Sequence, residues 1–174
     1  MRSRLWAAVC AVVLIGSLAG WGWFASDQAR AGWWAFGQHV AVGPDDQGVA
    51  TLETLGVRLV GVEEVAEVDE ERPPSGLRYL AVDLSVSTHG ASELRSCDVL
   101  LRDDRGRLFE AGAEVPREDP YVTSLTCGTT DPAEEPVPPD QSLLVLVPDD
   151  AELESVRVVT LDFPPARFLE LPLP

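Results

Sequence analysis

The sequence is poor in the residues with which proteins bind metals, transfer protons and attack substrates. It has two histidines, three cysteines and no lysine. The cysteines form no C-x-x-C pair and no cluster with histidine at zinc spacing, so we expect no zinc site and no dithiol redox site. The P-loop and the G-x-G-x-x-G motif are both missing, which argues against nucleotide cofactors.

A catalytic arrangement of side chains is not indicated either. The composition allows a Ser/His/Asp set, but no serine stands in a G-x-S-x-G elbow. His39 and His89 are predicted to be exposed polar residues, and the many carboxylate pairs follow from the abundance of acids alone. We therefore expect no enzyme activity, no catalytic residue, no cofactor and no resident metal.

Positive charge is also scarce. The 13 basic residues are all arginines, and they stand against 29 acidic residues. Arg2 and Arg4 precede an apolar segment; without them, 11 basic and 29 acidic residues remain, a net charge of −18. Phosphate backbones repel so acidic a chain, so we expect no binding to nucleic acid. The same charge favours solubility.

The apolar segment, Leu5 to Phe24, reads LWAAVCAVVLIGSLAGWGWF and contains no charge. About 20 such residues, at a helical rise of 1.5 Å each, match the roughly 30 Å hydrocarbon thickness of a bilayer. The arginines in front of it favour a cytoplasmic N-terminus. We expect a cytoplasmic segment at 1–4, a single-pass transmembrane signal-anchor helix at 5–24 and an extracytoplasmic C-terminal part at the cell membrane.

Two other fates of this segment stay open. A cleaved signal peptide would use Ala29-Arg30-Ala31 as its small-x-small site and release a secreted domain, although its apolar region is usually only about 7–15 residues long. A lipoprotein needs small residues in front of its cysteine. Val9 precedes Cys10 and apolar residues continue after it, so Cys10 is expected to be an apolar residue of the bilayer.

Residues 25–48 are predicted to be a juxtamembrane connector, and 49–174 an extracytoplasmic domain. The connector carries the aromatic patch Trp33-Trp34-Ala35-Phe36, for which contact with lipid and packing under the domain both remain open. In the domain, Leu77–Thr88 has the alternating pattern of a strand with one apolar face. The side chains that share this face are Leu80, Val82, Leu84 and Val86.

Further short apolar runs follow the same pattern, and turn residues separate them. Seven or eight such strands without a helical period predict an all-β domain, an antiparallel immunoglobulin-like β-sandwich. The expected strands besides Leu77–Thr88 are Val49–Leu52, Val57–Val68, a strand that aligns Cys97, Val99 and Leu101, Leu108–Ala111, Tyr121–Cys127, Leu143–Val147 and Val156–Phe163. The aromatic side chains of these runs are expected in the core, namely Tyr79, Phe109, Tyr121 and Phe163.

Cys97 and Cys127 are predicted to form a disulfide. Oxidising compartments permit disulfides, and the two cysteines lie thirty residues apart. The loop-entropy relation then gives a stabilisation of about 3–4 kcal/mol. Two buried free thiols are the alternative.

The stretch CDVLLRDDRGRLFE, from Cys97 to Glu110, sets acidic residues beside a glycine and poses the choice between a metal loop and a turn. A calcium loop of the EF-hand kind needs alternating acids and a later glutamate. Here Asp103 and Asp104 are adjacent and an arginine follows. We therefore predict a hairpin turn, in which Asp103 accepts backbone N–H bonds and Gly106 takes a positive φ.

Three phrases in this order carry a resemblance to a known family. They are YLAVDLSVS, the D-x-x-G-type turn followed by an aromatic, and LLVLVPDDA ahead of VRVVTLDF; the matching residues are Gly76, Tyr79, Leu80, Val82, Asp103, Gly106, Phe109, Val145, Val147 and Pro148. The set resembles the immunoglobulin-like domains of unknown function in bacterial, especially actinobacterial, secreted lipoproteins and membrane-anchored proteins. Where that family usually has Pro-Gly, this chain has Pro139-Asp140. The resemblance covers roughly 49–168 and implies an extracytoplasmic sandwich without catalytic residues.

Two functions fit these features. The first is a membrane-anchored protein-interaction domain, accessory to another protein of the cell envelope; the spacing of Gly16 and Gly20 would allow the helix to join that contact. The second is a binding module for a small ligand, cation or envelope polymer, with the acidic loops Glu67–Arg72 and Asp131–Asp140 as its surface. Glu63-Glu64 is predicted to be a solvated pair that protects an edge strand.

Overall fold

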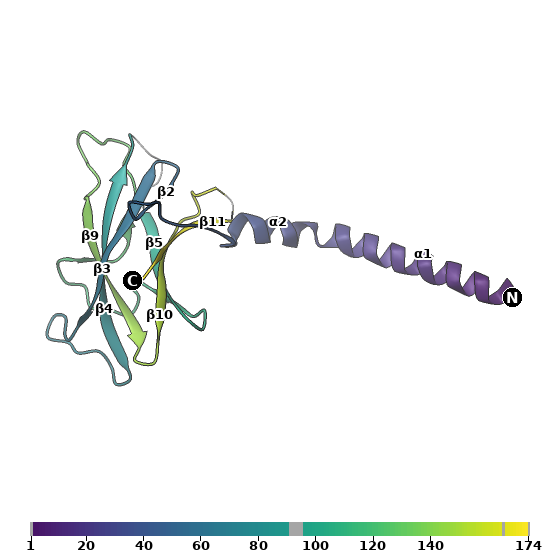
Figure 1. Ribbon diagram of the computed structural model, residues 1–174, viewed down its shortest axis with the longest axis horizontal. Helices are drawn as coiled ribbons and strands as arrows, with labels where there is room; N and C mark the ends of the chain where they lie inside the picture. Colours follow the sequence, from purple (N-terminus) through teal and green to yellow (C-terminus); the bar gives the residue numbers. More distant parts are fainter. Residues whose placement is uncertain (1, 91–95, 165, 174) are drawn as a thin grey trace. The chain divides into compact units, whose positions relative to one another are not determined.

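The computed structural model describes residues 2–90, 96–164 and 166–173. The chain consists of two compact units, with the boundary between Gly37 and Gln38. The first unit holds two helices, α1 (Arg2–Ala25) and α2 (Asp27–Phe36), and the second holds all the strands of the described residues (Figure 1). The segment predicted to connect membrane and domain therefore contains the helix α2, a short first strand and the turn at 43–48.

The strands form two sheets, which face each other as the layers of a β-sandwich (Figure 1). The first sheet has the order β1 (Val40–Val42), β11 (Arg167–Pro172), β10 (Leu153–Val159), β5 (Ser96–Asp103) and β6 (Leu108–Glu110), and β8 (Leu125–Thr126) also pairs with β5. The second sheet has the order β2 (Val49–Leu52), β3 (Leu55–Val65), β4 (Leu77–Thr88), β9 (Asp140–Pro148) and β7 (Tyr121–Val122).

The sheets are mixed, so the expectation of a purely antiparallel sandwich is wrong in two places. β1 runs parallel to β11, and β7 runs parallel to β9. Both are short strands at a sheet edge, and neither follows its partner through a hairpin. β1 meets a strand from the other end of the chain, and the segment between β7 and β9 crosses to the first sheet as β8. Such crossovers permit parallel pairing, which a tight turn does not.

The core lies between the sheets and is built as the alternation in the sequence predicts. The inner face of β4 buries the four expected side chains, with exposed fractions of 5% or less, and Cys97, Val99 and Leu101 line the inner face of β5. A second, smaller cluster lies on the outer face of the second sheet. There Tyr79, Leu144 and the loop residue Val68 are buried together.

The aromatic residues expected in the core divide into two groups. Tyr79 and Phe163 are buried. Phe109 and Tyr121 are only half-buried, because each sits on a strand of two or three residues at a sheet edge. The expected strand Tyr121–Cys127 is split into β7 and β8, which belong to different sheets.

Candidate interaction surface

The turn between β5 and β6 is built around one buried carboxylate. Asp103 is fully buried, and its Oδ1 accepts hydrogen bonds from the backbone N–H groups of Arg105, at 3.1 Å, and Arg107, at 2.7 Å. The Arg107 side chain donates from Nε to Asp103 Oδ2 at 2.6 Å. Gly106 has a φ of +76°, as the turn requires. The hairpin interpretation of the sequence is therefore confirmed.

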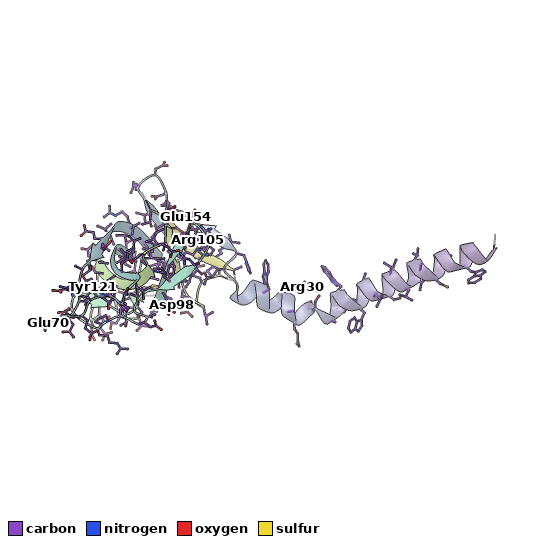
Figure 2. The ribbon with its side chains drawn as sticks, turned by 90° about the horizontal axis from the view of Figure 1, so that it is seen from below. Arg30, Glu70, Asp98, Arg105, Tyr121 and Glu154 are labelled. Carbon is purple, nitrogen blue, oxygen red and sulfur yellow. A yellow bond between two sulfur atoms is a disulfide. The ribbon has the colours of Figure 1, made fainter. Side chains whose placement is uncertain are left out.

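A second turn of the chain packs against this one. Arg105 and Arg107 both donate to Asp150, at 2.6 Å and 3.3 Å, and the backbone N–H of Asp104 donates to the Glu152 carbonyl. Arg105 is labelled in Figure 2. These contacts tie the β5–β6 turn to the β9–β10 turn, so the basic residues of this corner are occupied by carboxylates of the same chain.

The electrostatics of the corner favour charged carboxylates. Burial raises the pKa of Asp103, but the hydrogen bonds from the Arg107 side chain and from the backbones of Arg107 and Arg105 outweigh it, so the pKa lies below its ordinary value. The side-chain hydrogen bonds from Arg105 and Arg107 likewise hold the pKa of Asp150 below its ordinary value. The corner is a structural ion-pair network that is complete without a ligand.

The acidic loops and the histidines show no metal-ligand geometry. Within the described residues, no group of three or more His, Cys, Asp or Glu side chains could hold a metal ion. In the loop Asp131–Asp140, Asp131 Oδ1 instead accepts the backbone N–H groups of Ala133 and Glu134, which shapes a turn. His39 and His89 are both exposed.

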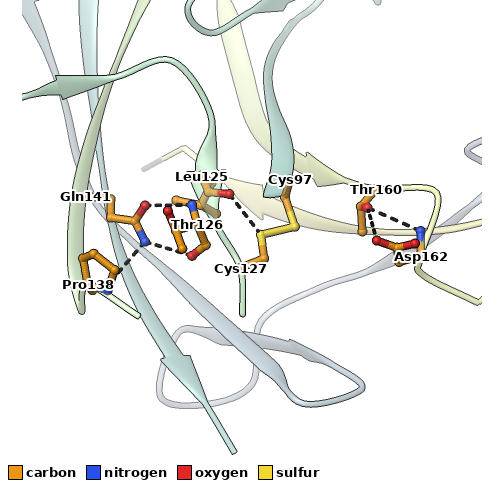
Figure 3. Close-up of a disulfide and its surroundings, with 8 residues drawn as sticks. All are labelled: Cys97, Leu125, Thr126, Cys127, Pro138, Gln141, Thr160 and Asp162. Carbon is orange, nitrogen blue, oxygen red and sulfur yellow. Dashed lines mark hydrogen bonds between the residues drawn. A yellow bond between two sulfur atoms is a disulfide. The ribbon is translucent and has the colours of Figure 1, made fainter. Parts of the chain in front are cut away.

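One side of the sandwich is closed by covalent and cross-sheet links, and we call it the closed side. It consists of β6, β7 and β8 with the loop between them. The structure joins Cys97 to Cys127, with the two Cα atoms 5.9 Å apart, so the predicted pair forms (Figure 3). The buried Gln141 of β9 accepts the Thr126 N–H at 2.8 Å and donates to the Thr126 and Pro138 carbonyls (Figure 3).

A glycine brings the two sheets together on the same side. The N–H of Gly112 donates to the Leu144 carbonyl at 2.8 Å, and Ala111 forms a bridge with Val145. Gly112 has a φ of +75°, and an added Cβ would lie 2.4 Å from the Thr123 carbonyl oxygen. Only glycine fits this position. Nothing in the local sequence distinguishes it from the other glycines of the chain.

Among the residues that the structure describes, the opposite side has no disulfide and no hydrogen bond between the two sheets, and we call it the open side. There β2 begins at Val49, opposite Arg58, and β1 ends at Val42, opposite Leu169, so the later halves of β3 and β11 continue without those neighbours. A groove of about 810 Å³ runs between these halves. The segment that links β1 to β2 borders it at Pro44, Gln47 and Gly48.

The floor of the groove is apolar. Leu59 and Val62 of β3, Leu153 of β10 and Leu173 are half-buried and pack against the core. The strand β3 has a bulge between Leu59 and Gly61, and the side chain at the bulge, Val60, is 61% exposed. The sequence predicts Leu59, Val60 and Val62 as part of a strand, but it does not predict that half of this strand lacks a neighbour.

The helical unit exposes apolar side chains around α1, from Val9 to Phe24. In the part of the chain whose side chains are described, no single helix is long and apolar enough to cross a membrane; Val9–Ala25 and Asp27–Trp33, bent by 47°, meet the length and composition required only as a pair. An added Cβ at Gly16 or Gly20 meets nothing within 4 Å, so their face of α1 is open.

Arg30 holds the bend. Its guanidinium donates to the Trp23 carbonyl at 2.6 Å, to Ser26 Oγ and to Asp27 Oδ1, and it lies 3.9 Å from the centre of the Trp23 ring. A cation beside the last carbonyls of α1 complements the helix dipole. The break between the helices is therefore stabilised by the contacts of Arg30, whose charge is neutralised by Asp27.

Comparisons with known proteins give little beyond this geometry. No family model matches the chain, and no curated protein is similar to it. Among solved structures, it is similar to a "putative lipoprotein (ycdA)" of Bacillus subtilis, with 8% identity over 74% of this chain and 39% of the other, and a TM-score of 0.46. It is also similar to an uncharacterized β-sandwich protein of Clostridium difficile, with 12% identity over 78% and 95% of the two chains, and a TM-score of 0.37. Neither organism supports an actinobacterial origin, and the assignment as a β-sandwich rests on the two sheets of this chain.

Proposed function

We propose that this chain is a membrane-anchored protein whose extracytoplasmic sandwich, an immunoglobulin-like domain, binds another protein of the cell envelope and has no catalytic activity. The observation that carries the proposal is the contrast between the two sides of the sandwich. On the closed side a disulfide and cross-sheet hydrogen bonds hold short edge strands in place, whereas the open side keeps an apolar groove beside the half of β3 that β2 leaves unpaired. Unpaired strand edges are the usual sites of strand-to-strand association between proteins.

The anchoring part of the proposal is supported by α1. A helix that is apolar all round is stable in a protein core or in lipid, and the described side chains of α1 are exposed to 48% or more at its large apolar residues. Trp21, Trp23 and Trp33 surround the bend, where aromatic rings favour the membrane–water interface. In this arrangement the acidic domain lies outside the cell, where its disulfide is stable. Signal-peptide cleavage and secretion is the alternative location.

Two experiments in the native membrane test the proposal. Alkaline carbonate should leave the full-length chain in the membrane fraction, with α1 uncleaved by mass; release of a shortened chain would replace the anchor with a signal peptide. A photoreactive residue placed in turn at exposed sites of the domain should crosslink one recurrent envelope protein. Exchange of 2–36 for an unrelated anchor measures whether the helices share in that contact.

A second candidate function follows from the size of the groove, since about 810 Å³ is within the range of small-molecule sites. The chain would then be an extracytoplasmic binding module for a small ligand, cation or envelope polymer. Titration with calcium up to the millimolar range separates this function from the first. An increase in the melting temperature of the domain favours the module, and an unchanged melting temperature favours the interaction domain.

A further inference from the structure

The later half of β3 is an unpaired strand edge. β2 pairs only with Leu55–Arg58, whereas β4 pairs with β3 along its whole length to Val65. Among the described residues, no strand lies on the other side of 59–65. The backbone N–H and C=O groups on that side are therefore available to a further strand, which would continue the line of β2.

The second strand that borders the groove does not offer the same edge. β1 covers Arg167–Leu169 of β11, and the uncovered end carries Pro172, which has no N–H group. The next N–H, of Leu173, is donated to the Glu154 carbonyl. No proline occurs in Leu55–Val65. An added strand would therefore join the second sheet through β3, and β11 would supply a wall.

The groove also has a place for side chains of an added strand. Successive residues of a strand point to opposite faces, so every second side chain would face the core side, above Leu59, Val62 and Leu153. Apolar side chains fit this floor. The bulge leaves open space beside Gly61, where an added Cβ meets nothing within 4 Å. An occupant with alternating apolar residues matches this shape.

Charge determines which occupant is favoured. Glu63 and Glu64 are both exposed and lie within the free edge. Glu64 forms an ion pair with the half-buried Arg78 at 3.6 Å, and no ion pair of Glu63 occurs in the described chain. A second copy paired along this edge would bring four glutamates together, so like charge opposes self-association. A basic segment would experience attraction at the same place, in a chain with 29 acidic residues.

We infer that the open side is a strand-addition site, at which an extended partner segment with alternating apolar and basic residues pairs with 59–65 of β3. This inference rests on the proposed function, and it names the surface and the chemistry of the partner. The glutamates then have two effects: they keep copies of this chain apart, and they select a partner of opposite charge.

The probe is a nine-residue peptide of alternating valine and arginine, blocked at both ends. It is added to the full-length chain in detergent micelles, and amide hydrogen exchange localises the binding. We expect slower exchange within 59–65. A valine–glutamate peptide, and a valine–arginine peptide that is N-methylated at alternate residues, should leave this segment unchanged, because the first has the wrong charge and the second cannot form the ladder.

Glu63→Lys and Glu110→Lys form a matched pair, because both change the net charge equally and both replace an exposed glutamate on a stretch of strand that has a neighbour on one side only. Glu110 belongs to β6, at the far edge of the other sheet. We expect Glu63→Lys to weaken binding of the valine–arginine peptide about three- to tenfold, the effect of reversing one cross-strand charge, and to improve binding of the valine–glutamate peptide. Glu110→Lys should change either affinity less than about twofold. Should Glu63→Lys fail to fold, Glu63→Gln takes its place.

In the peptide experiments, three results would overturn the inference: equal weakening by both variants, protection elsewhere than 59–65, or equal binding of the N-methylated peptide. Photocrosslinking in the native membrane separates this failure from failure of the proposed function. Capture of an envelope protein from Leu108 or Val122 but not from Val60 leaves the interaction function standing and removes the groove as its site. Capture of a second copy from Val60 also overturns the inference, and capture from no position removes the function itself.

Discussion

The two sides of the sandwich differ in how the two sheets are connected to each other. On the closed side, a buried glutamine and a glycine tie the first sheet to the second, and a disulfide ties β5 to the segment that follows β8. On the open side, β1 and β2 pair with only the first part of β11 and of β3, and an apolar groove lies beside the parts that they leave uncovered. The difference shows that the domain has the means to close an edge and applies them on one side only. We expect the stability of the domain to reside in the closed side and its recognition in the open side.

Loss of the disulfide should be the largest single effect on the closed side. The double variant Cys97→Ala/Cys127→Ala should lower the free energy of unfolding by about 3–4 kcal/mol, because the unfolded chain regains the entropy of a thirty-residue loop. Urea denaturation of the full-length chain in micelles measures it. Cys10→Ala, which removes the exposed free cysteine of α1, is the matched control and should change little. Equal stability of the double variant and the control would contradict the assignment.

The cross-sheet contact at Gly112 should come next. Gly112→Ala should cost roughly 2–3 kcal/mol, because the position combines a positive φ with a Cβ that would meet the Thr123 backbone. Gly61→Ala on the open side is the control, since its Cβ would meet nothing within 4 Å and its φ is not positive. If both variants lost the same stability, the two sides would not differ as described.

The corner at Asp103 lies at the end of the sandwich, and its contribution to the stability of the fold should depend on pH. The pKa of Asp103 is lower in the folded chain than its ordinary value of 3.8, so the carboxylate stabilises the fold above about pH 4, and this stability is lost as the pH falls toward the folded pKa. Asp150 contributes in the same direction. Asp103→Asn should lower the melting temperature by about 3–6 °C at pH 7.

Between pH 4 and pH 2, the stability of Asp103→Asn should decrease less steeply than that of the original chain, because one titrating group is missing. Asp104→Asn, at the exposed neighbour, serves as the control for the loss of one carboxylate from the same turn. Denaturation with urea at several pH values provides the measurement. Parallel slopes for the original chain and Asp103→Asn would show that Asp103 does not carry the dependence.

The smallest effect is expected on the open side. Val60→Thr should change the free energy of unfolding by no more than about 0.5 kcal/mol, because the side chain is exposed and has no part in the core. Val57→Thr on the same strand is the contrasting variant, since Val57 is fully buried and its hydroxyl analogue would lie in an apolar core. Thermal unfolding measures both. A large loss at Val60 would mean that the groove already holds packed structure.

The local features of this fold follow from the sequence. The alternation of Leu77–Thr88 predicts both the strand β4 and its buried face, and the order of residues from Asp103 to Gly106 predicts the turn with its carboxylate and its positive φ. In each case the physical cause lies within a few residues. The disulfide follows from having only two cysteines outside the apolar segment.

The features that distinguish the two sides depend on residues far apart in the chain. β1 has three residues and pairs with the last strand, so no local pattern reveals it. The need for glycine at 112 comes from Thr123 backbone atoms that approach only in the folded state. The open side exists because β1 and β2 cover only part of β11 and of β3, and the extent of that pairing cannot be deduced from the sequence of the longer strand. Of the features of the open side, only the glutamates at 63 and 64 could be interpreted from the sequence, as a pair that protects an edge strand.

The most direct test of the contrast is amide hydrogen exchange of the full-length chain without any partner. We predict fast exchange for the amides of 59–65 that point away from β4, and slow exchange for Ala111 and Gly112, whose N–H groups donate to Val99 and Leu144. Addition of the valine–arginine peptide should then slow the first group only. Slow exchange of all amides in 59–65 without a partner would show that the edge is already paired, and it would contradict the account of an open side.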